Sequence, residues 1–403
     1  MNRYHLYFLG VIVDRYQDDC IRVTRIKISA GTIIHTKQGK CCVITENLLG
    51  GSIKVVNLHI VHADIIPINL AKLIPKEKYT ATLVDLFDTK TEIIGYAKSE
   101  SEFNDQASII ADKLAYYDKL FDIYNDYEGI NNIKTINDNA GLAPVVVDEE
   151  VINLIKLGYD MYYETDGNVN IAMGSVLKLW HEYRQAGLDN PSQAALPSIE
   201  ELEEANAHTY IEAIIINEEN STVYLSDPEM SLDVGSIAKG YAVEHTLEYA
   251  KSQGLDDILI SAGGNIDSLG ARADGTAFKV GIQNPDLSSD ESYVAIVYIR
   301  YGKSVVSSGD YQRFYTVDGV DYCHIINPYT LFPSTDFSQV TVIYDDSGMA
   351  DAYSTALFNM SLNEGMLTVE SIDGMEAMWI DKKGNAAYSS GFEEFLVDED
   401  EEE

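Results

Sequence analysis

The chain has 403 residues, of which 46% are hydrophobic and 23% are charged, proportions typical of a globular protein with an apolar core. Its 65 Asp and Glu residues outnumber 28 Lys and Arg, and the formal charge is −37, which argues against nucleic acid or an anionic lipid surface as a partner. No apolar run approaches the ~18 residues of a membrane span, so no transmembrane helix is expected.

Basic residues are concentrated at the start of the chain. Residues 1–78 contain 11 Lys and Arg and 6 Asp and Glu, whereas the other 325 residues contain 17 and 59. This change of sign predicts a boundary near Lys76–Tyr79. Before it, β-branched residues predict short strands at Ile21–Ile28, Thr32–His35, Cys42–Thr45 and Ile53–Ala63. We expect residues 1–78 to be a small β-rich module or a poorly ordered leader, to which no chemistry is assigned.

After the boundary, hydrophobic spacing predicts hairpins and helices. Tyr79–Phe87 and Thr91–Ala97 are expected to pair, and apolar side chains at three- and four-residue steps predict a helix over Phe103–Tyr127. Ser198 and Glu201 fit a capping box that begins another helix. The other predicted helices are Asp148–Glu164, Ser236–Gln253 and Ala350–Ser361.

Short β-rich runs predict further strands in the second half of the chain. These are Ile211–Ile216, Thr222–Leu225, Asp257–Ser261, Phe278–Ile282, Tyr293–Tyr301 and Gln339–Tyr344. Residues 393–403 are predicted to form an acidic tail. Its last six residues, Asp398–Glu403, are all acidic and are expected to be solvated and disordered.

A first candidate site is the segment DVGSIAKGYA, which spans Asp233–Ala242. Gly235 and Ser236 stand at a predicted helix start, where free N–H groups and the helix dipole suit an anionic group such as phosphate. Lys239 adds a positive charge one turn further on. A capped helix with a solvated lysine would give the same pattern, so the segment alone leaves both interpretations open.

A second candidate is AGGN, Ala262–Asn265, directly after an apolar strand. The adjacent Gly263 and Gly264 would let a ligand approach the backbone closely, although an ordinary tight turn uses the same pair. The segment is not a GxGxxG dinucleotide fingerprint, and the chain contains no Walker sequence.

A third candidate combines SGDYQRFY, from Ser308, with HIINPYT, from His324. These segments place Asp310, Arg313 and His324 at the ends of predicted strands. His324 stands in a turn bounded by proline and surrounded by polar residues, a context that is compatible with either a catalytic or a structural histidine.

The fourth candidate is DAYST, which begins at Asp351. On a helix, Asp351, Ser354 and Thr355 share one face. One carboxylate with hydroxyl groups suits Mg²⁺ that is bound together with a substrate phosphate. An exposed polar helix start would have the same spacing.

The ordered motifs together resemble those of the FAD:protein FMN transferases, the ApbE-like flavin transferases. The resemblance covers residues 79–392 and includes the softer segments Asn168–Gly174 and Leu179–Trp180. It implies an α+β fold with two similar halves of antiparallel sheet and packed helices, a T-fold-like duplication. Leu331 departs from the pattern, because the family commonly has Gly at this position, and it puts the geometry of that turn in question.

The resemblance implies an enzyme that uses FAD as substrate and Mg²⁺ as cofactor. Such enzymes transfer the FMN half of FAD to a Thr or Ser hydroxyl of a target flavoprotein, and AMP leaves. By motif position, the metal ligands would be the Ser236 carbonyl, Asp351 and Thr355. The FAD-binding residues would be Asn170, Ile171, Ala172, Asp233, Lys239, Gly263, Gly264, Asp310 and His324. His324 and Asp233 are the candidates for catalysis, and the proton acceptor is left open.

Two other functions would use the same residues. A metal-dependent FAD pyrophosphatase would replace the protein hydroxyl by water, and a non-catalytic flavin-binding protein would perform no transfer. The family also implies an extracytoplasmic, membrane-associated location. Against this, the apolar run Tyr4–Val13 is a poor signal peptide, and no lipobox is visible.

Overall fold

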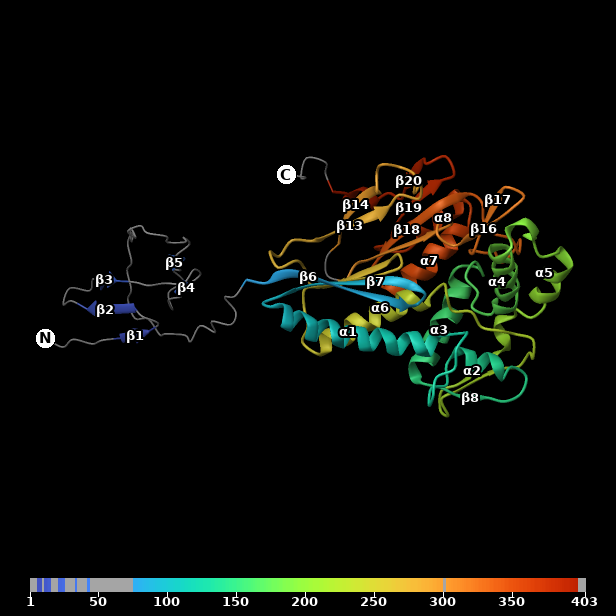
Figure 1. The fold of residues 1–403 in the computed structure, drawn as a ribbon, viewed down its shortest axis with the longest axis horizontal. Helices are drawn as coiled ribbons and strands as arrows, with labels where there is room; N and C mark the ends of the chain where they lie inside the picture. The colour runs from blue at the N-terminus through green and yellow to red at the C-terminus, as the bar shows by residue number, and fades with distance from the viewer. Residues whose placement is uncertain are drawn as a thin grey trace. The chain divides into compact units, whose positions relative to one another are not determined.

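The computed structural model describes residues 75–299 and 302–397 and, before residue 75, five short strands (Figure 1). The chain divides into two compact units, Met1–Pro75 and Lys76–Glu403. In the first unit, an antiparallel three-stranded sheet has the order β1-β2-β3, and β4 pairs with β5. These strands are β1 (Leu6–Phe8), β2 (Val11–Arg15), β3 (Ile21–Arg25), β4 (Ile33–Ile34) and β5 (Cys42–Val43). The strand predicted at Ile53–Ala63 lies outside the described residues.

An eight-stranded antiparallel sheet is the centre of the second unit. Its strand order is β20-β19-β18-β15-β12-β11-β7-β6. The strands are β6 (Glu77–Leu86), β7 (Thr89–Ala97), β11 (Ile258–Ala262), β12 (Asn265–Leu269), β15 (Ser304–Gly309), β18 (Phe337–Tyr344), β19 (Glu376–Asp381) and β20 (Ala386–Tyr388).

The sheet consists of two halves with the same topology. In the first half, β6 and β7 are followed by α1 and, after an insertion, by α6, β11 and β12; in the second, β15 and β18 are followed by α7, α8, β19 and β20. The helices are α1 (Glu100–Phe121), α6 (Ala238–Ser252), α7 (Ser347–Asn359) and α8 (Leu362–Glu370). The predicted α+β fold with two similar halves is confirmed.

Helix α1 shows how local sequence sets its limits. Ser99 caps its start, where the hydroxyl accepts a hydrogen bond from the Glu102 amide. The sequence predicted a helix to Tyr127, but the structure ends it at Phe121. The reason is Asp122, whose carboxylate accepts hydrogen bonds from the Tyr124 and Asn125 amides and so turns the chain away.

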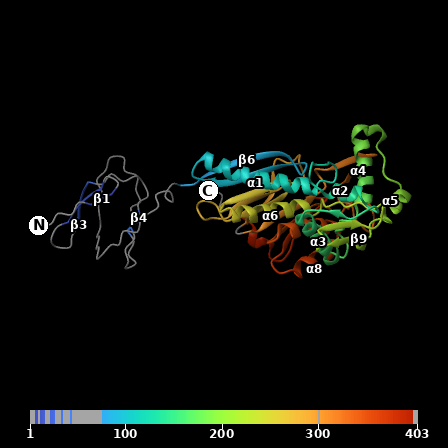
Figure 2. The ribbon, with the colours of Figure 1, turned by 90° about the horizontal axis from the view of Figure 1, so that it is seen from below.

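The two faces of the large sheet are covered by different elements, helices on one face and a hairpin on the other. In β11, Ile258 and Ile260 point to the helical side, where they pack with residues of α1 and α6, and Leu259 points to the opposite side. Figure 2 shows α1 and α6 lying side by side. The opposite face is covered by a separate hairpin formed by β13 (Phe278–Gln283) and β14 (Tyr293–Ile299).

The insertion between α1 and α6 forms a helical region beside the sheet (Figure 1). Its helices are α2 (Ile133–Asp138), α3 (Glu149–Glu164), α4 (Gly174–Asp189) and α5 (Ile199–Asn206), accompanied by the small sheet β8 (Val145–Val146), β10 (Thr222–Leu225) and β9 (Ile214–Asn217). The capping box at Ser198 is present. Helices α2, α4 and α8 were not predicted, and the start of the predicted strand Ile211–Ile216 is a 3-10 helix, Ile211–Ala213.

Two remaining features complete the second unit. A hairpin is formed by β16 (Phe314–Val317) and β17 (Val320–Cys323). The acidic tail begins later than predicted, because Phe392–Phe395 is a 3-10 helix and the Val397 amide donates to the Ile296 carbonyl at 2.9 Å. Asp398–Glu403 lie outside the described residues. Within the described parts of the chain, no helix combines the length and the apolar character that crossing a bilayer requires.

Candidate active site

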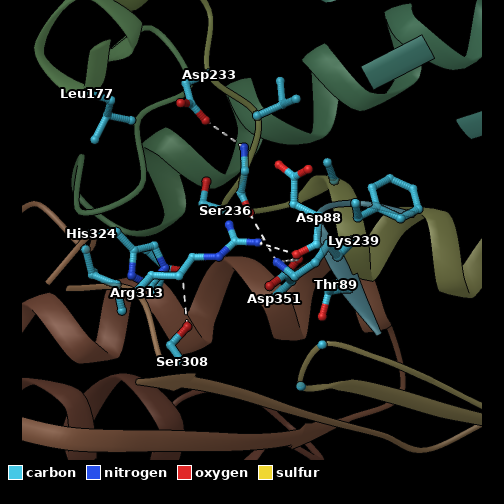
Figure 3. A pocket seen from close by; sticks show the side chains of 18 of the residues that line it. Asp88, Thr89, Leu177, Asp233, Ser236, Lys239, Ser308, Arg313, His324 and Asp351 are labelled. Carbon is cyan, nitrogen blue, oxygen red and sulfur yellow. Dashed lines mark hydrogen bonds and ion pairs between the residues drawn. The ribbon is translucent and has the colours of Figure 1, made fainter. Parts of the chain in front are cut away.

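A pocket of about 2320 Å³ brings together the four sequence motifs. Its wall includes the turn before α6, the β11–β12 turn, the segment after β17 and one face of α7. The side chains of Asp233, Lys239, Arg313, His324 and Asp351 gather around it, with Asp351 next to Lys239 (Figure 3). Asp233 and Asp351 therefore share one site, although they are 118 positions apart in the sequence.

Asp351 links α7 to α6 at the base of the pocket. Its Oδ2 accepts a hydrogen bond from the Gly240 amide at 2.9 Å and lies 3.9 Å from Lys239 Nζ. Burial raises the pKa of Asp351, while the Lys239 charge and the Gly240 hydrogen bond act in the opposite direction. A further cation at this carboxylate would offset the cost of burying its charge.

Hydroxyl groups continue the polar surface one turn along α7. Thr355 lines the pocket, and its Oγ1 lies 3.4 Å from Ser308 Oγ. Ser354, which shares the predicted motif, is fully buried and does not line the pocket. Its hydroxyl instead donates to the Asp351 carbonyl at 2.9 Å and lies 2.7 Å from Ser308 Oγ. The described residues hold no group of three or more His, Cys, Asp or Glu that would form an all-protein metal cage.

The turn before α6 is shaped by Asp233. Its Oδ1 accepts a hydrogen bond from the Gly235 amide at 2.9 Å, and this turn carries Ser236 into the pocket wall. Helix α6 therefore begins at Ala238, two residues later than predicted. Lys239 Nζ donates to the Gly235 carbonyl at 3.4 Å. Burial raises the pKa of Asp233, although the charges of Lys239 and other cations oppose this effect.

His324 stands among positive charges. Loss of solvation among the pocket walls lowers its pKa to about 3, and the charges of Arg313, Lys239 and Arg184 act in the same direction. The ring is nevertheless open to the pocket, so water reaches it and moderates the loss of solvation. His324 is therefore a neutral imidazole at neutral pH. Its amide donates to the Arg313 carbonyl at 3.0 Å, which sets the two side chains next to each other.

Three residues predicted to bind FAD do not line this pocket. Ile171 and Ala172 are fully buried, and Ile171 packs against Gly158, where even a Cβ atom would come within 2.6 Å of it. The Ile171 carbonyl accepts a hydrogen bond from the Asp233 amide at 2.9 Å and so supports the site from behind. Asp310 forms an ion pair with Lys382 outside the pocket wall.

The other predicted binding residues border the pocket. Asn170 does so, but its side chain is held by the Ala172 amide and the Thr209 carbonyl, at 2.9 and 3.0 Å. Gly263 and Gly264 form the β11–β12 turn with φ values of 53° and 99°, a conformation that favours glycine. A Cβ atom at Gly263 would lie 2.3 Å from Thr89 Oγ1, so only glycine fits this turn.

Several pocket residues escaped the sequence prediction. Asp88 lies in the β6–β7 turn and Thr89 begins β7, and the Asp88 carbonyl accepts a hydrogen bond from Arg313 at 3.1 Å (Figure 3). His181 and Arg184, on α4, contact each other at 3.1 Å and also line the pocket. The signal in the sequence was their three-residue spacing, which places both on one face of a helix after Leu179–Trp180.

Leu331 occupies the turn position at which the family commonly has glycine, and the turn is formed without it. Its φ is +63°, a left-handed conformation uncommon for a leucine, and its amide donates to the Asn327 carbonyl at 2.8 Å. Its own carbonyl accepts a hydrogen bond from the Trp180 indole at 2.9 Å. The side chain is buried with Trp180 and Tyr315, and this packing offsets the backbone strain.

Comparison with known proteins shows to which family this chain is similar. The ApbE family model matches residues 87–379. The chain is 29% identical over 280 residues to an FAD:protein FMN transferase of Klebsiella pneumoniae, covering 68% of this chain and 84% of the relative, and 33% identical over 271 residues to one of Treponema pallidum, covering 63% and 72%. The crystal structure of the ApbE protein from Thermotoga maritima covers 80% of this chain and 100% of its own, at a TM-score of 0.70 and 28% identity.

Proposed function

The chain belongs to the ApbE family and is a flavin transferase, and on this premise we propose that it transfers FMN from FAD to a Thr or Ser hydroxyl of an acceptor flavoprotein, with Mg²⁺ bound and AMP released. The observation that carries this proposal is the convergence of Asp351, Lys239 and His324 on one pocket. A buried carboxylate beside a lysine and a neutral imidazole suits the cleavage of a diphosphate.

The donor set fits Mg²⁺ better than a metal with nitrogen or sulfur ligands. Asp351 offers a buried carboxylate, Thr355 a hydroxyl on the same helix face and Ser236 a backbone carbonyl in the facing wall. Mg²⁺ prefers such hard oxygen donors and commonly combines one or two carboxylates with substrate phosphates. These three residues would hold the ion, which would supply neutralisation of the phosphate charge.

The side chains of the pocket can account for binding and proton transfer. In the proposed reaction, the acceptor hydroxyl oxygen forms a bond to the FMN phosphorus, the bond from that phosphorus to the bridging oxygen breaks, and AMP leaves with the bridging oxygen. Lys239 and Arg313 stabilise negative charge on the diphosphate. The neutral His324 is the candidate acceptor of the hydroxyl proton, because an imidazolium could not take it.

Mass spectrometry of a co-expressed flavoprotein tests the proposal. The acceptor should gain one FMN on a Thr or Ser in the presence of FAD and Mg²⁺, and AMP should appear in equal amount. Release of FMN and AMP without labelled acceptor would instead identify an FAD pyrophosphatase, and binding of FAD without turnover would identify a storage protein. We also propose an extracytoplasmic, membrane-associated location, which is supported by family resemblance alone.

A further inference from the structure

The pocket continues beyond the catalytic side chains along one edge of the β13–β14 hairpin. All six residues of β13, Phe278–Gln283, line it, whereas Tyr293 is the one residue of β14 that does. Ile94, Leu259 and Ile266, from three neighbouring strands of the large sheet, also border it, although they pack against the inward-facing side chains of the hairpin. The pocket therefore continues as a groove along the edge of the hairpin, beside the sheet on which the hairpin packs.

The edge of β13 that faces this groove has free backbone hydrogen-bonding groups. Val397 donates to the Ile296 carbonyl, so the polar backbone groups of Ile296 point away from β13. Its partner Gly281 therefore belongs to a non-hydrogen-bonded pair, and so does Lys279 two residues earlier. The N–H and C=O groups of Lys279 and Gly281 thus point outward, and within the described residues no strand or backbone hydrogen bond covers them.

One end of the groove lies beside the catalytic residues, and the other end carries two basic side chains. Strand β7 leads from Thr89, beside the catalytic residues, to Tyr96, a separation of about 23 Å for seven residues of extended chain. At the far end, Lys78 pairs across the sheet with Tyr96, and Arg272 Nε lies 3.3 Å from the Tyr96 hydroxyl. Two cations at this end contrast with a chain whose formal charge is −37.

We propose that the acceptor protein places its flavinylated Thr or Ser on an extended segment that lies in this groove and adds to β13 as a third strand. The unpaired N–H and C=O groups at Lys279 and Gly281 would bind its backbone, as in other cases of strand addition. An acidic side chain about seven residues from the reactive hydroxyl would reach Lys78 and Arg272. This inference rests on the proposed function and specifies how its protein substrate binds.

Proline substitutions provide a matched test of the strand edge. Lys279→Pro removes an outward N–H without removing a hydrogen bond to β14, and proline is tolerated at such edge positions. Ala386→Pro, on the last strand of the large sheet, is the control. The Asp381 amide donates to the Asn385 carbonyl, so Ala386 and Ile380 form a non-hydrogen-bonded pair. The N–H of Ala386 therefore also points outward. Lys279→Ala separates the loss of the side-chain charge from the loss of the N–H.

The measurement is the rate of FMN incorporation as a function of acceptor concentration. The probe is a synthetic peptide with the residue that wild-type enzyme labels and about seven residues on each side. We expect Lys279→Pro to raise the KM for the peptide roughly tenfold, since one hydrogen bond and the close approach of the strand are lost. Ala386→Pro should retain the wild-type KM, and Lys279→Ala should remain within about threefold of it.

Hydrogen exchange on the wild-type protein gives a second, independent readout. The Lys279 and Gly281 amides should become protected when the peptide is added to enzyme saturated with FAD. Protection by FAD alone, or a parallel loss of FAD affinity in Lys279→Pro, would show that FAD lies along β13 and would overturn the inference. An unchanged KM with no protection would refute strand addition while transfer itself stands. If wild-type enzyme labels no flavoprotein, both the function and this inference are wrong.

Discussion

The amide of Gly240 lies 2.9 Å from Asp351 Oδ2, and this hydrogen bond joins α6 to α7 below the pocket. A Cβ atom at Gly240 would lie 2.1 Å from the Ser347 carbonyl oxygen and 2.7 Å from Asp351 Cβ. The close approach of the two helices therefore requires glycine. It also brings Lys239, the residue before Gly240, to the same carboxylate.

Gly240→Ala should separate α6 from α7 and displace Asp351. We expect a loss of about 1–3 kcal/mol in the free energy of unfolding, because the added methyl group meets backbone atoms that cannot move independently. FMN transfer should fall more than stability alone explains. Urea unfolding and transfer assays would check this, with exposed Lys251→Ala on the same helix as control. Wild-type stability and activity of the Gly240 variant would contradict the close contact between the two helices.

Asp351→Ala should abolish FMN transfer at limiting Mg²⁺. The proposed site has one carboxylate, and without its charge the ion has only neutral oxygen ligands. Thr355→Ala should lower the affinity for Mg²⁺ less than Asp351→Ala does, because a neutral hydroxyl contributes less than an anion. Transfer rates measured across a Mg²⁺ titration would rank the variants. Equal rates for Asp351→Ala and wild type at low Mg²⁺ would remove Asp351 from the metal site.

His324→Asn should lower the rate of FMN transfer by ~10²–10⁴-fold while FAD still binds, if His324 accepts the proton. An ordinary histidine pKa of about 6.5 would predict a rate that rises with pH through that value. The lowered pKa of His324 changes this expectation: the ring is already neutral, so its titration should leave kcat/KM level between about pH 6 and 8. Loss of FAD binding with little change in the rate of bound enzyme would instead make His324 a positioning residue.

Glu244 should make the protein less stable as the pH rises. Burial raises its pKa to about 8, and the nearby Asp267 and Asp346 act in the same direction. Since its pKa is higher in the folded than in the unfolded state, the stability that its proton contributes is present below about pH 4.5 and is lost as the pH rises through 8. Glu244→Gln should reduce this loss in thermal unfolding at pH 5–9, whereas Glu203→Gln, an exposed glutamate that does not act on Glu244, should not.

Removal of the first unit should leave FMN transfer intact, because the pocket is built from residues after Pro75. The sequence suggested a cut after residue 78, but β6 begins at Glu77 and Lys76 forms an ion pair with Asp257. A chain that starts at Lys76 should therefore retain the wild-type kcat/KM. A chain that starts at Tyr79 should be less stable, since it lacks two residues of the edge strand β6 and the ion pair between Lys76 and Asp257. Loss of folding in the Lys76 variant would show that the first unit completes the core.

Much of the fold could be read from local patterns. Residue spacing placed four of the eight strands of the large sheet, β6, β7, β11 and β18, and every long helix except α4, and the capping box at Ser198 identified the start of α5. Helix α4 was missed because its start has no capping signal: its N-cap is Met173, which makes no side-chain cap hydrogen bond, and its first residue is Gly174. The family resemblance implied two similar antiparallel halves, but the order of the eight strands in one sheet came only from the structure, because pairing over long sequence separations leaves no local signal.

The sequence by itself determined which residue types were present for the chemistry: a carboxylate and hydroxyl on one helix face, a lysine in a helix start, and a histidine in a polar turn. Only the tertiary structure decided which of them meet. It brought Arg313 to Asp88, paired Asp310 with Lys382 outside the pocket, and buried Ile171 behind Asp233. It also decided the charge state of His324, because a pKa depends on burial and on cations contributed by distant segments, which no local pattern specifies.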